Sequence, residues 1–185
     1  MTEATMQSKR WRTLDTVYVA LFAVIIAVCA WISIPTTIPF TLQTFAVFIA
    51  LGLLGGKRGT LATLVYILLG AVGIPVFSGF TGGVGILFGT TGGYIIGFLG
   101  SALVYWGITK LLGTKPWTMV LGMVLGLAVC YAFGTAWFME VYARTSGAIG
   151  LATALGWCVI PFIIPDLCKI ALALVLTRPL QRYVK

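Results

Sequence analysis

The sequence predicts an all-α integral membrane protein, built as a single bundle of six transmembrane helices with both termini in the cytoplasm. Three observations lead to this prediction: the composition, the lengths of the apolar runs and the distribution of Lys and Arg. Of the 185 residues, 60% are hydrophobic and only 9% are charged, whereas about 25% of the residues of a soluble domain are charged. Too few polar residues remain to cover a soluble globule, and the length favours one membrane domain, residues 1–185, without an appended soluble domain.

The apolar runs predict the helices in chain order. A membrane-spanning helix needs about 20 mainly apolar residues, with a range of roughly 17–25. We expect spans at about residues 14–34, 40–55, 58–73, 90–110, 116–139 and 157–177. The second and third runs are short, so we expect them to be tilted or shielded by neighbouring helices. The first run is longer than the apolar core of a signal peptide and has no A-x-A cleavage site, so we expect it to remain as a helix.

The basic residues predict the orientation, because cytoplasmic loops are enriched in Lys and Arg. With six spans, the head, the turns at 56–59 and 110–116, and the tail fall on one side. That side holds ten of the 12 basic residues: Lys9, Arg10, Arg12, Lys57, Arg58, Lys110, Lys115, Arg178, Arg182 and Lys185. The outward side holds only Arg144, and Lys169 lies inside the last run. These charges anchor helix ends and do not form a nucleic-acid-binding face.

The outward loop at 74–89 is rich in glycine and has little helix propensity. A flexible connector is one interpretation, and a lid that folds over a cavity is the other. The loop also carries large apolar side chains, which a simple connector does not need: Phe77, Phe80, Val84, Ile86, Leu87 and Phe88. This content favours the lid.

Small residues recur at helical spacing in three of the runs, and such stripes let membrane helices approach closely. In the runs at 90–110 and 116–139 we expect them to pack helices within the chain. In the first run, internal packing and docking of another protein fit the pattern equally well. The stripes consist of Ala20, Ala23, Ala27 and Ala30; Gly93, Gly97 and Ser101; and Gly122, Gly126, Cys130 and Gly134.

Several kinds of catalytic and cofactor site are excluded. There is no histidine, which removes His-based triads and H-E-x-x-H zinc sites, and the four cysteines form no C-x-x-C pair. Gly56-Lys57-Arg58 is similar to the end of a phosphate-binding loop, but Leu51 and Arg58 stand where that motif needs Gly and Ser or Thr. The sequence therefore predicts no cofactor, no metal site and no enzymatic activity.

One carboxylate and one ammonium group, those of Asp166 and Lys169, lie inside the last apolar run. A charge at mid-bilayer depth costs roughly 2.5–3.5 kcal/mol. Their spacing of three residues places both on one helical face, and Pro161 and Pro165 remove backbone N–H groups beside them. They either form an ion pair that holds helices together or belong to a ligand site. The second interpretation is favoured, because buried ion pairs contribute little to stability.

Four segments resemble signatures of the BioY family, the biotin-binding S components of energy-coupling factor (ECF) vitamin transporters. They are PFTLQTFAVF at 39–48, residues 55–79, GTTGGYIIGF at 89–98, and PDLCK at 165–169. The resemblance runs from about residue 14 to 180. The sequence departs from the family pattern at three places: Thr90 replaces a proline, Phe80-Thr81 replaces a Gly-Gly pair, and Ile164-Pro165 replaces Pro-Gly.

The resemblance implies an S-component fold: a six-helix substrate-capture subunit with an outward-facing biotin pocket in a bacterial cell membrane. Its partners would be biotin, a membrane coupling subunit, two ABC ATPase subunits and the lipid bilayer, with no nucleic acid. The alanine stripe of the first run would then be the docking face. A self-sufficient secondary carrier is the alternative, for which an inverted repeat is expected and none is evident. A membrane enzyme would need a catalytic constellation that the sequence lacks.

Biotin has two ureido N–H donors, one ureido acceptor, an apolar body and a carboxylate tail. Under the resemblance, Asp166 accepts a hydrogen bond from a ureido N–H or pairs with Lys169. Lys169 compensates the negative charge of Asp166 and donates a hydrogen bond to the ligand. The end of biotin that each one meets stays open. The candidate substrate-binding residues are Asp166, Lys169, Gln43, Thr44, Phe77, Gly79, Thr91, Gly92, Gly93, Tyr94 and Trp137. The aromatic members either pack on the biotin rings or lie in the core or at the lipid interface.

Overall fold

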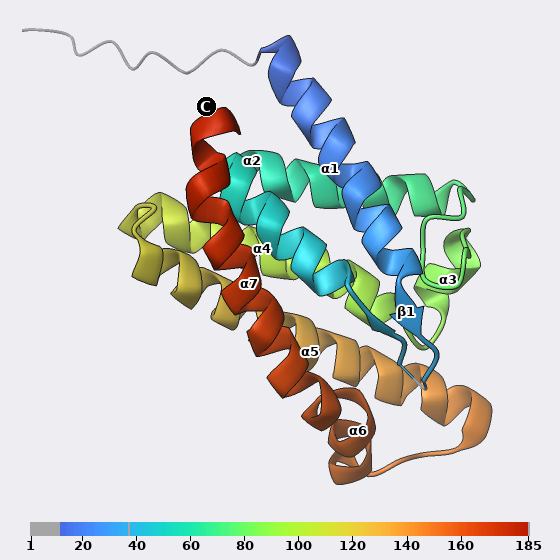
Figure 1. The fold of residues 1–185 in the computed structure, drawn as a ribbon. Helices are drawn as coiled ribbons and strands as arrows, with labels where there is room; N and C mark the ends of the chain where they lie inside the picture. Colours follow the sequence, from blue (N-terminus) through green and yellow to red (C-terminus); the bar gives the residue numbers. More distant parts are fainter. Residues whose placement is uncertain (1–11, 37, 185) are drawn as a thin grey trace, which may run out of the picture.

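The computed structural model describes residues 12–36 and 38–184, so the basic residues Lys9, Arg10 and Lys185 lie outside the described residues. The chain is mainly helical (Figure 1). The elements are α1 (Thr13–Trp31), β1 (Ser33–Ile34), β2 (Phe40–Thr41), α2 (Gln43–Ala71), α3 (Val84–Phe88), α4 (Gly92–Leu112), α5 (Pro116–Ser146), α6 (Leu151–Cys158) and α7 (Ile160–Val184). The departures from an all-α fold in the described residues are the two-residue antiparallel ladder of β1 and β2 and an isolated bridge between Phe77 and Thr81.

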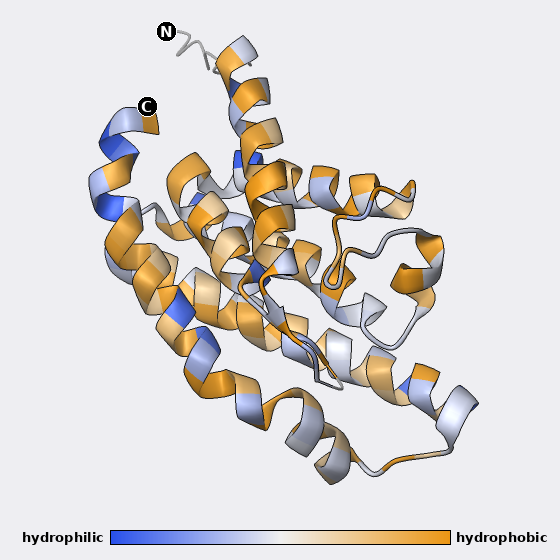
Figure 2. Ribbon diagram, turned by 45° about the vertical axis from the view of Figure 1, so that its right-hand side comes forward, coloured by the Kyte–Doolittle hydropathy of each residue, from blue (hydrophilic) through white to orange (hydrophobic). Residues whose placement is uncertain are grey.

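Five helical segments of the described residues are long and apolar enough to cross a membrane: α1, α2, α4, α5 and the segment 151–184 formed by α6 and α7. Figure 2 shows hydrophobic residues along most of the length of these helices. A helix that is hydrophobic all round is buried in protein or lipid. The chain is therefore a multi-pass membrane protein.

The predicted count of six separate helices is not confirmed, because the runs at 40–55 and 58–73 both lie in α2. Gly55 interrupts this helix with φ 80° and ψ 168°, a conformation that is essentially restricted to glycine. The two limbs of α2 run in different directions from this point (Figure 1). The two limbs lie close together beside the bend. A Cβ atom on Gly59 would lie only 2.8 Å from the Cα atom of Leu51, so only glycine fits at this position.

Helices α4 and α5 pack through their small residues, so the internal packing predicted for these two runs is confirmed. A Cβ atom on Gly126 would lie 2.8 Å from the carbonyl oxygen of Ser101, and one on Gly134 would lie 2.3 Å from the ring of Tyr94. No larger residue fits at either place without separating the helices. The small-xxx-small spacing thus sets the distance between α4 and α5.

The alanine stripe of α1 faces the interior of the chain. Ala23, Ala27 and Ala30 are 1%, 4% and 0% exposed and belong to the hydrophobic core, whereas Ala20 is exposed. This corrects the docking expectation for the three buried alanines, because a buried side chain cannot contact another protein unless the helices separate. The stripe serves internal packing, the other interpretation that its spacing allowed.

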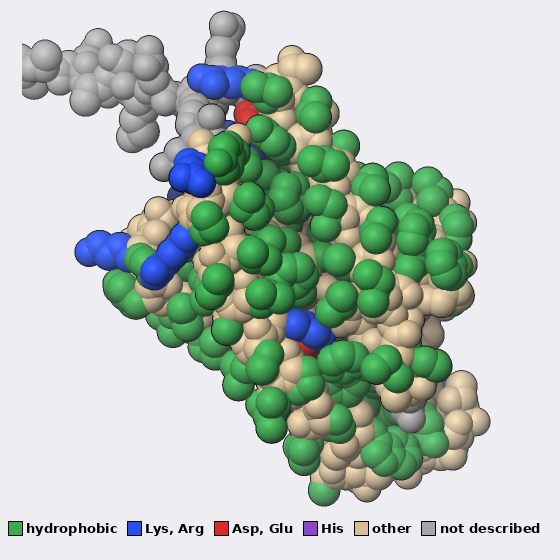
Figure 3. All heavy atoms as spheres, in the orientation of Figure 1, with side chains coloured by type: hydrophobic (Ala, Val, Ile, Leu, Met, Phe, Trp, Pro, Cys, Tyr) green, Lys and Arg blue, Asp and Glu red, His purple; other side chains and the backbone are tan. Residues whose placement is uncertain are grey.

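The start of α1, the bend of α2, the turn between α4 and α5 and the end of α7 meet at one end of the bundle. Residues of all four segments line a common cavity there, among them Arg12, Lys57, Thr114 and Gln181. Lys and Arg side chains gather at this end, near the termini, whereas hydrophobic side chains cover most of the face shown in Figure 3. One of these charges is paired, because Arg58 forms a 2.9 Å salt bridge with Asp15.

Candidate functional site

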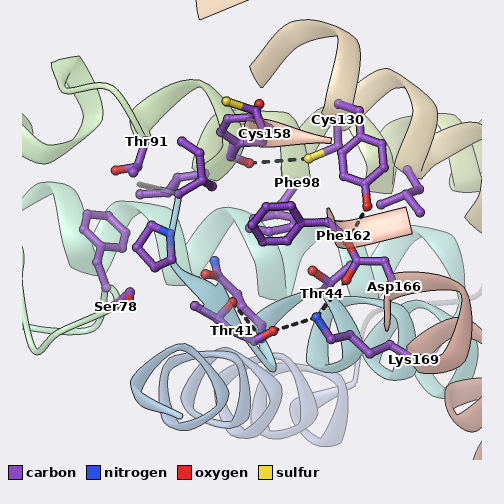
Figure 4. Close-up of a pocket in the computed structure, with 18 of the residues that line it drawn as sticks. Thr41, Thr44, Ser78, Thr91, Phe98, Cys130, Cys158, Phe162, Asp166 and Lys169 are labelled. Carbon is purple, nitrogen blue, oxygen red and sulfur yellow. Dashed lines mark hydrogen bonds and ion pairs between the residues drawn. The ribbon is translucent and has the colours of Figure 1, made fainter. Parts of the chain in front are cut away.

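A cavity lined by buried charged and polar side chains lies at the opposite end of the described chain. Its walls come from β2, the beginning of α2, the 72–91 segment, α4, α5 and α7. The lining combines aliphatic and aromatic side chains with hydroxyl, amide and charged groups (Figure 4). Small-molecule sites commonly have this composition, since the apolar walls bury the ligand and the polar groups orient it.

Asp166 and Lys169 form a buried ion pair in this cavity. They are 3% and 7% exposed, and the Nζ atom of Lys169 lies 2.7 Å from the Oδ1 atom of Asp166. The same Nζ donates a second hydrogen bond of 2.7 Å to the carbonyl oxygen of Thr41 in β2, and it lies 4.2 Å from the centre of the Phe40 ring. The ammonium group is therefore compensated by a carboxylate, a carbonyl and an aromatic face. Figure 4 shows how the lysine links α7 to β2.

Asp166 has a second partner on another helix. The hydroxyl group of Tyr131 in α5 donates a hydrogen bond of 2.6 Å to the Oδ2 atom of Asp166. The sequence analysis missed Tyr131, and no sequence signal could have found it, because a single tyrosine in an apolar run is an ordinary interfacial or core residue. Only the packing of α5 beside α7 brings it to the carboxylate.

Gln43, at the beginning of α2, supplies an uncompensated polar group. Its side chain is buried, at 4% exposure, and lines the cavity. Its Nε2 atom has no hydrogen-bond partner among the described residues. A buried amide nitrogen without a partner costs roughly 1–3 kcal/mol, and at the cavity this donor is available to an acceptor. Thr44, one residue further along α2, is also buried at the cavity.

The structure brings seven of the 11 candidate substrate-binding residues to the cavity and leaves four outside its lining. Those at the cavity are Gln43, Thr44, Phe77, Thr91, Tyr94, Asp166 and Lys169. Two of the aromatic residues are held by neighbours. The ring of Phe77 packs edge-on against that of Tyr66, with ring centres 5.6 Å apart. The hydroxyl group of Tyr94 lies 2.9 Å from the Oγ1 atom of Thr135.

The four candidates outside the lining are Gly79, Gly92, Gly93 and Trp137, and each has a visible packing or turn role. A Cβ atom on Gly92 would lie 1.8 Å from the carbonyl oxygen of Leu87, and one on Gly93 would lie 2.3 Å from the Cβ atom of Trp137. The indole N–H of Trp137 donates to the carbonyl oxygen of Gly89 at 3.0 Å. Gly79 has φ 71° in the turn of the outward segment. Glycine serves close approach and positive φ here.

Other lining residues were not predicted. They include Thr41, Ser78, Phe98, Cys130, Cys158 and Phe162, which Figure 4 places around the cavity. Of the two cysteines, Cys130 belongs to the small-residue stripe that was expected to pack helices. The Sγ atom of Cys130 lies 3.6 Å from the carbonyl oxygen of Tyr94, so this thiol also contributes to the junction of α4 and α5. No cluster of three or more potential metal ligands exists within residues 12–36 and 38–184.

The segment between α2 and α4 lies beside the cavity and is tied to α1. Phe77 and Ile86 are the members of its apolar set that line the cavity, while Phe80 is exposed. The indole N–H of Trp31, the last residue of α1, donates to the carbonyl oxygen of Pro75 at 2.9 Å, and its ring stacks on Phe80 with centres 4.9 Å apart. These two contacts hold the segment against the end of α1.

Comparison with known proteins supplies independent information. The sequence model of the BioY family matches residues 3–185. The chain is 40% identical over 163 residues to a protein of Thermotoga maritima named "Biotin transporter BioY", covering 88% of this chain and 92% of that protein. It is 35% identical over 166 residues to "Biotin transporter BioY2" of Lactococcus lactis, with coverage of 89% and 88%. Its structure is similar to the crystal structure of "the S-component for biotin from an ECF-type ABC transporter", with a TM-score of 0.80, 27% identity and coverage of 91% and 90%.

Proposed function

The chain belongs to the BioY family, and we propose that it is the biotin-binding S component of an ECF-type vitamin uptake transporter. The observation that carries the assignment of the site is the cavity in which Asp166, Lys169 and the unpartnered amide of Gln43 are buried together. The names of the relatives support biotin as the vitamin, and the buried polar groups of the cavity support it as the binding place.

The polar groups of the cavity are complementary to those of biotin. The two oxygens of Asp166 each accept one hydrogen bond from the protein, and a carboxylate oxygen can accept two. Asp166 therefore keeps capacity for the ureido N–H donors. Lys169 uses its Nζ atom for two bonds, and an ammonium group has three donors. One donor of Lys169 and the amide of Gln43 remain for ligand oxygens.

We further propose that both termini face the cytoplasm of a bacterial cell and that the chain crosses its membrane six times. The two limbs of α2, which run in different directions from Gly55, would provide two of the crossings. The gathering of basic side chains at the end that holds the start of α1 and the end of α7 supports this orientation under the positive-inside rule. The vitamin cavity then opens to the outside.

As an S component, the chain would capture the vitamin and catalyse no reaction itself. A membrane coupling subunit and two ABC ATPase subunits would supply the energy, because the glycine-lysine turn of α2 lacks the residues of a phosphate-binding loop. The buried alanines of α1 are not available as a docking face. The apolar residues on the outer surface of α1 are exposed, among them Leu14, Val17, Leu21, Val24 and Val28.

The segment 74–89 would act as a lid over the bound vitamin. Its support is the contact of Phe77 and Ile86 with the cavity and the positive φ angles of its glycines, which allow the backbone to turn sharply. The hydrogen bond from Trp31 to Pro75 and the stacking of Trp31 on Phe80 would hold the lid closed.

Calorimetric titration of the purified, ligand-stripped protein in detergent tests the function. We expect tight one-to-one binding of biotin, loss of most of the affinity in Asp166→Asn and Lys169→Ala, and unchanged affinity in Glu140→Gln. Glu140 is a suitable control because its ion pair with Arg144 is solvent-exposed and far from the cavity lining. A folded wild-type protein that ignores biotin and binds another vitamin would contradict the substrate. Equal binding by wild type and both cavity variants would contradict the site.

A further inference from the structure

Tyr131 is the feature of the cavity that neither the sequence nor the proposed function explains. It lies in α5, is half-buried and lines the cavity. Its hydroxyl group donates to the Oδ2 atom of Asp166 at 2.6 Å, within the range of short charge-assisted O–H···O⁻ bonds. The bond joins α5 to α7 across 35 residues of sequence.

Two buried tyrosines, Tyr94 and Tyr66, do not make this kind of bond. The hydroxyl group of Tyr94 meets the neutral hydroxyl of Thr135, and that of Tyr66 has no partner among the described residues. Tyr131 therefore differs from them in the charge of its partner. A tyrosine that served packing alone would not need its hydroxyl group at a carboxylate.

Asp166 needs a partner outside its own helix. Lys169 holds its Oδ1 atom at a spacing of three residues on α7. Pro165 precedes Asp166 inside α7 and has no N–H to donate to the carbonyl group four residues earlier, at Pro161. Helices bend and loosen at such positions. Because α5 runs unbroken from Pro116 to Ser146, a bond from Tyr131 fixes the carboxylate to a more regular helix.

With one oxygen held by Lys169 and the other by Tyr131, the plane of the Asp166 carboxylate is determined. Its free lone pairs then point in fixed directions, and each can accept from a ligand N–H. We propose that Tyr131 is a positioning residue for biotin binding: it orients Asp166 and does not need to touch the vitamin. This inference rests on the proposed function, because it assigns Tyr131 a role at that same site.

The test compares Tyr131→Phe with Tyr66→Phe. Each change removes one hydroxyl group from a buried tyrosine, but only Tyr131 uses it on a partner in the described chain. We expect Tyr131→Phe to weaken biotin binding about tenfold, since a hydrogen bond to a charged group contributes on this order. Tyr66→Phe should bind as the wild type does. In an Asp166→Asn background, Tyr131→Phe should change the affinity less than about twofold, because the group that it orients has lost its charge.

A second measurement needs no ligand. The chain has two aspartates, Asp15 and Asp166, so labelling aspartate carboxyl groups with ¹³C gives two carboxylate signals in infrared spectra, and Asp166→Asn assigns them. We expect Tyr131→Phe to shift the Asp166 band and leave the Asp15 band in place. Unchanged affinity, or a loss of affinity of the same size in both backgrounds, would overturn the inference. A shifted band in a protein that does not bind biotin would instead overturn the proposed function, and with it the role in binding.

Discussion

Removing the ammonium group of Lys169 should separate its contribution to stability from its contribution to binding. The group makes two hydrogen bonds of 2.7 Å, to Asp166 and to the carbonyl oxygen of Thr41. Hydrogen bonds to charged groups contribute about 1.5–3 kcal/mol each. Their sum agrees with the roughly 3–5 kcal/mol that is lost when one partner of a buried ion pair is removed. We expect Lys169→Ala to lower the free energy of unfolding by about this amount.

The double variant Asp166→Leu/Lys169→Met replaces the ion pair by apolar side chains of similar size. Such replacements are often neutral or stabilising by about 1–4 kcal/mol. Here the variant also leaves the hydroxyl group of Tyr131 and the carbonyl group of Thr41 without their partners, and each unpaired group costs roughly 1–3 kcal/mol. At the middle of these ranges, the double variant should recover about half of the stability lost in Lys169→Ala, while biotin binding is abolished.

Reversible unfolding in mixed micelles, followed by tryptophan fluorescence, measures the stability, and calorimetry measures the binding. Arg144→Ala is the matched control: its 2.7 Å ion pair with Glu140 is solvent-exposed, so its loss should change stability by less than about 1 kcal/mol. A double variant as unstable as Lys169→Ala would refute the reasoning from uncompensated charge. A double variant that binds biotin normally would show that the pair is structural.

Three further changes test other parts of the structure. Gln43→Leu removes the unpartnered amide, so the ligand-free protein should be more stable by about 1 kcal/mol, while biotin binds roughly tenfold more weakly, as measured by thermal unfolding and calorimetry. Gly126→Ala places a methyl group against the backbone of Ser101 and should destabilise the protein by about 1–3 kcal/mol in the same unfolding assay. Trp31→Phe keeps an aromatic ring but loses the bond to Pro75, so biotin should dissociate several-fold faster in a stopped-flow displacement assay.

Each of these changes has its own control. Gly156→Ala introduces the same methyl group in α6 with no described atom within 4 Å and should be neutral or stabilising. Trp117→Phe removes an indole from an exposed position at the other end of the bundle and should leave biotin dissociation unchanged. If Gln43→Leu lowers stability without affecting affinity, the amide has a partner that we have not recognised. If Gly126→Ala is as stable as Gly156→Ala, α4 and α5 are less tightly packed than their contacts indicate.

The sequence predicted those properties that composition and spacing determine. Long apolar runs located the helices, and small residues repeated every four residues predicted that α4 and α5 each pack closely within the chain. The alanine stripe of α1 could not be interpreted in the same way, because small residues predict a close approach without specifying the partner. In the structure, that partner is the chain's own core. The bend at Gly55 adjoins the turn predicted at 56–59, so the break between the two runs was predicted from the sequence. The sharpness of the bend was not, since a glycine permits a positive φ angle in any turn without requiring that two helical limbs follow each other directly.

Some residues of the candidate site could likewise be predicted from the sequence, and others could not. Asp166 and Lys169 were identifiable because a charge in an apolar run is costly wherever it lies. Gly92 and Gly93 were assigned to the ligand, but they face Leu87 and Trp137, since a glycine that admits a ligand and one that admits a neighbouring side chain have the same sequence signature. Tyr131 could not be found, because its importance depends on the contact between two helices.

The bond from Lys169 to Thr41 joins residues 128 positions apart, and this separation has a consequence for biogenesis. During synthesis, β2 and the first limb of α2 enter the membrane long before α7 exists. The cavity lacks one wall until the last helix is inserted and docks, so no earlier intermediate can hold the vitamin. A ligand that binds only the finished fold stabilises only that fold, by about 2.7 kcal/mol at a concentration 100 times its Kd. We therefore expect the vitamin to favour retention of the last helix and to protect newly made chains from quality-control proteases. The supply of biotin would then also influence the amount of this protein in the membrane.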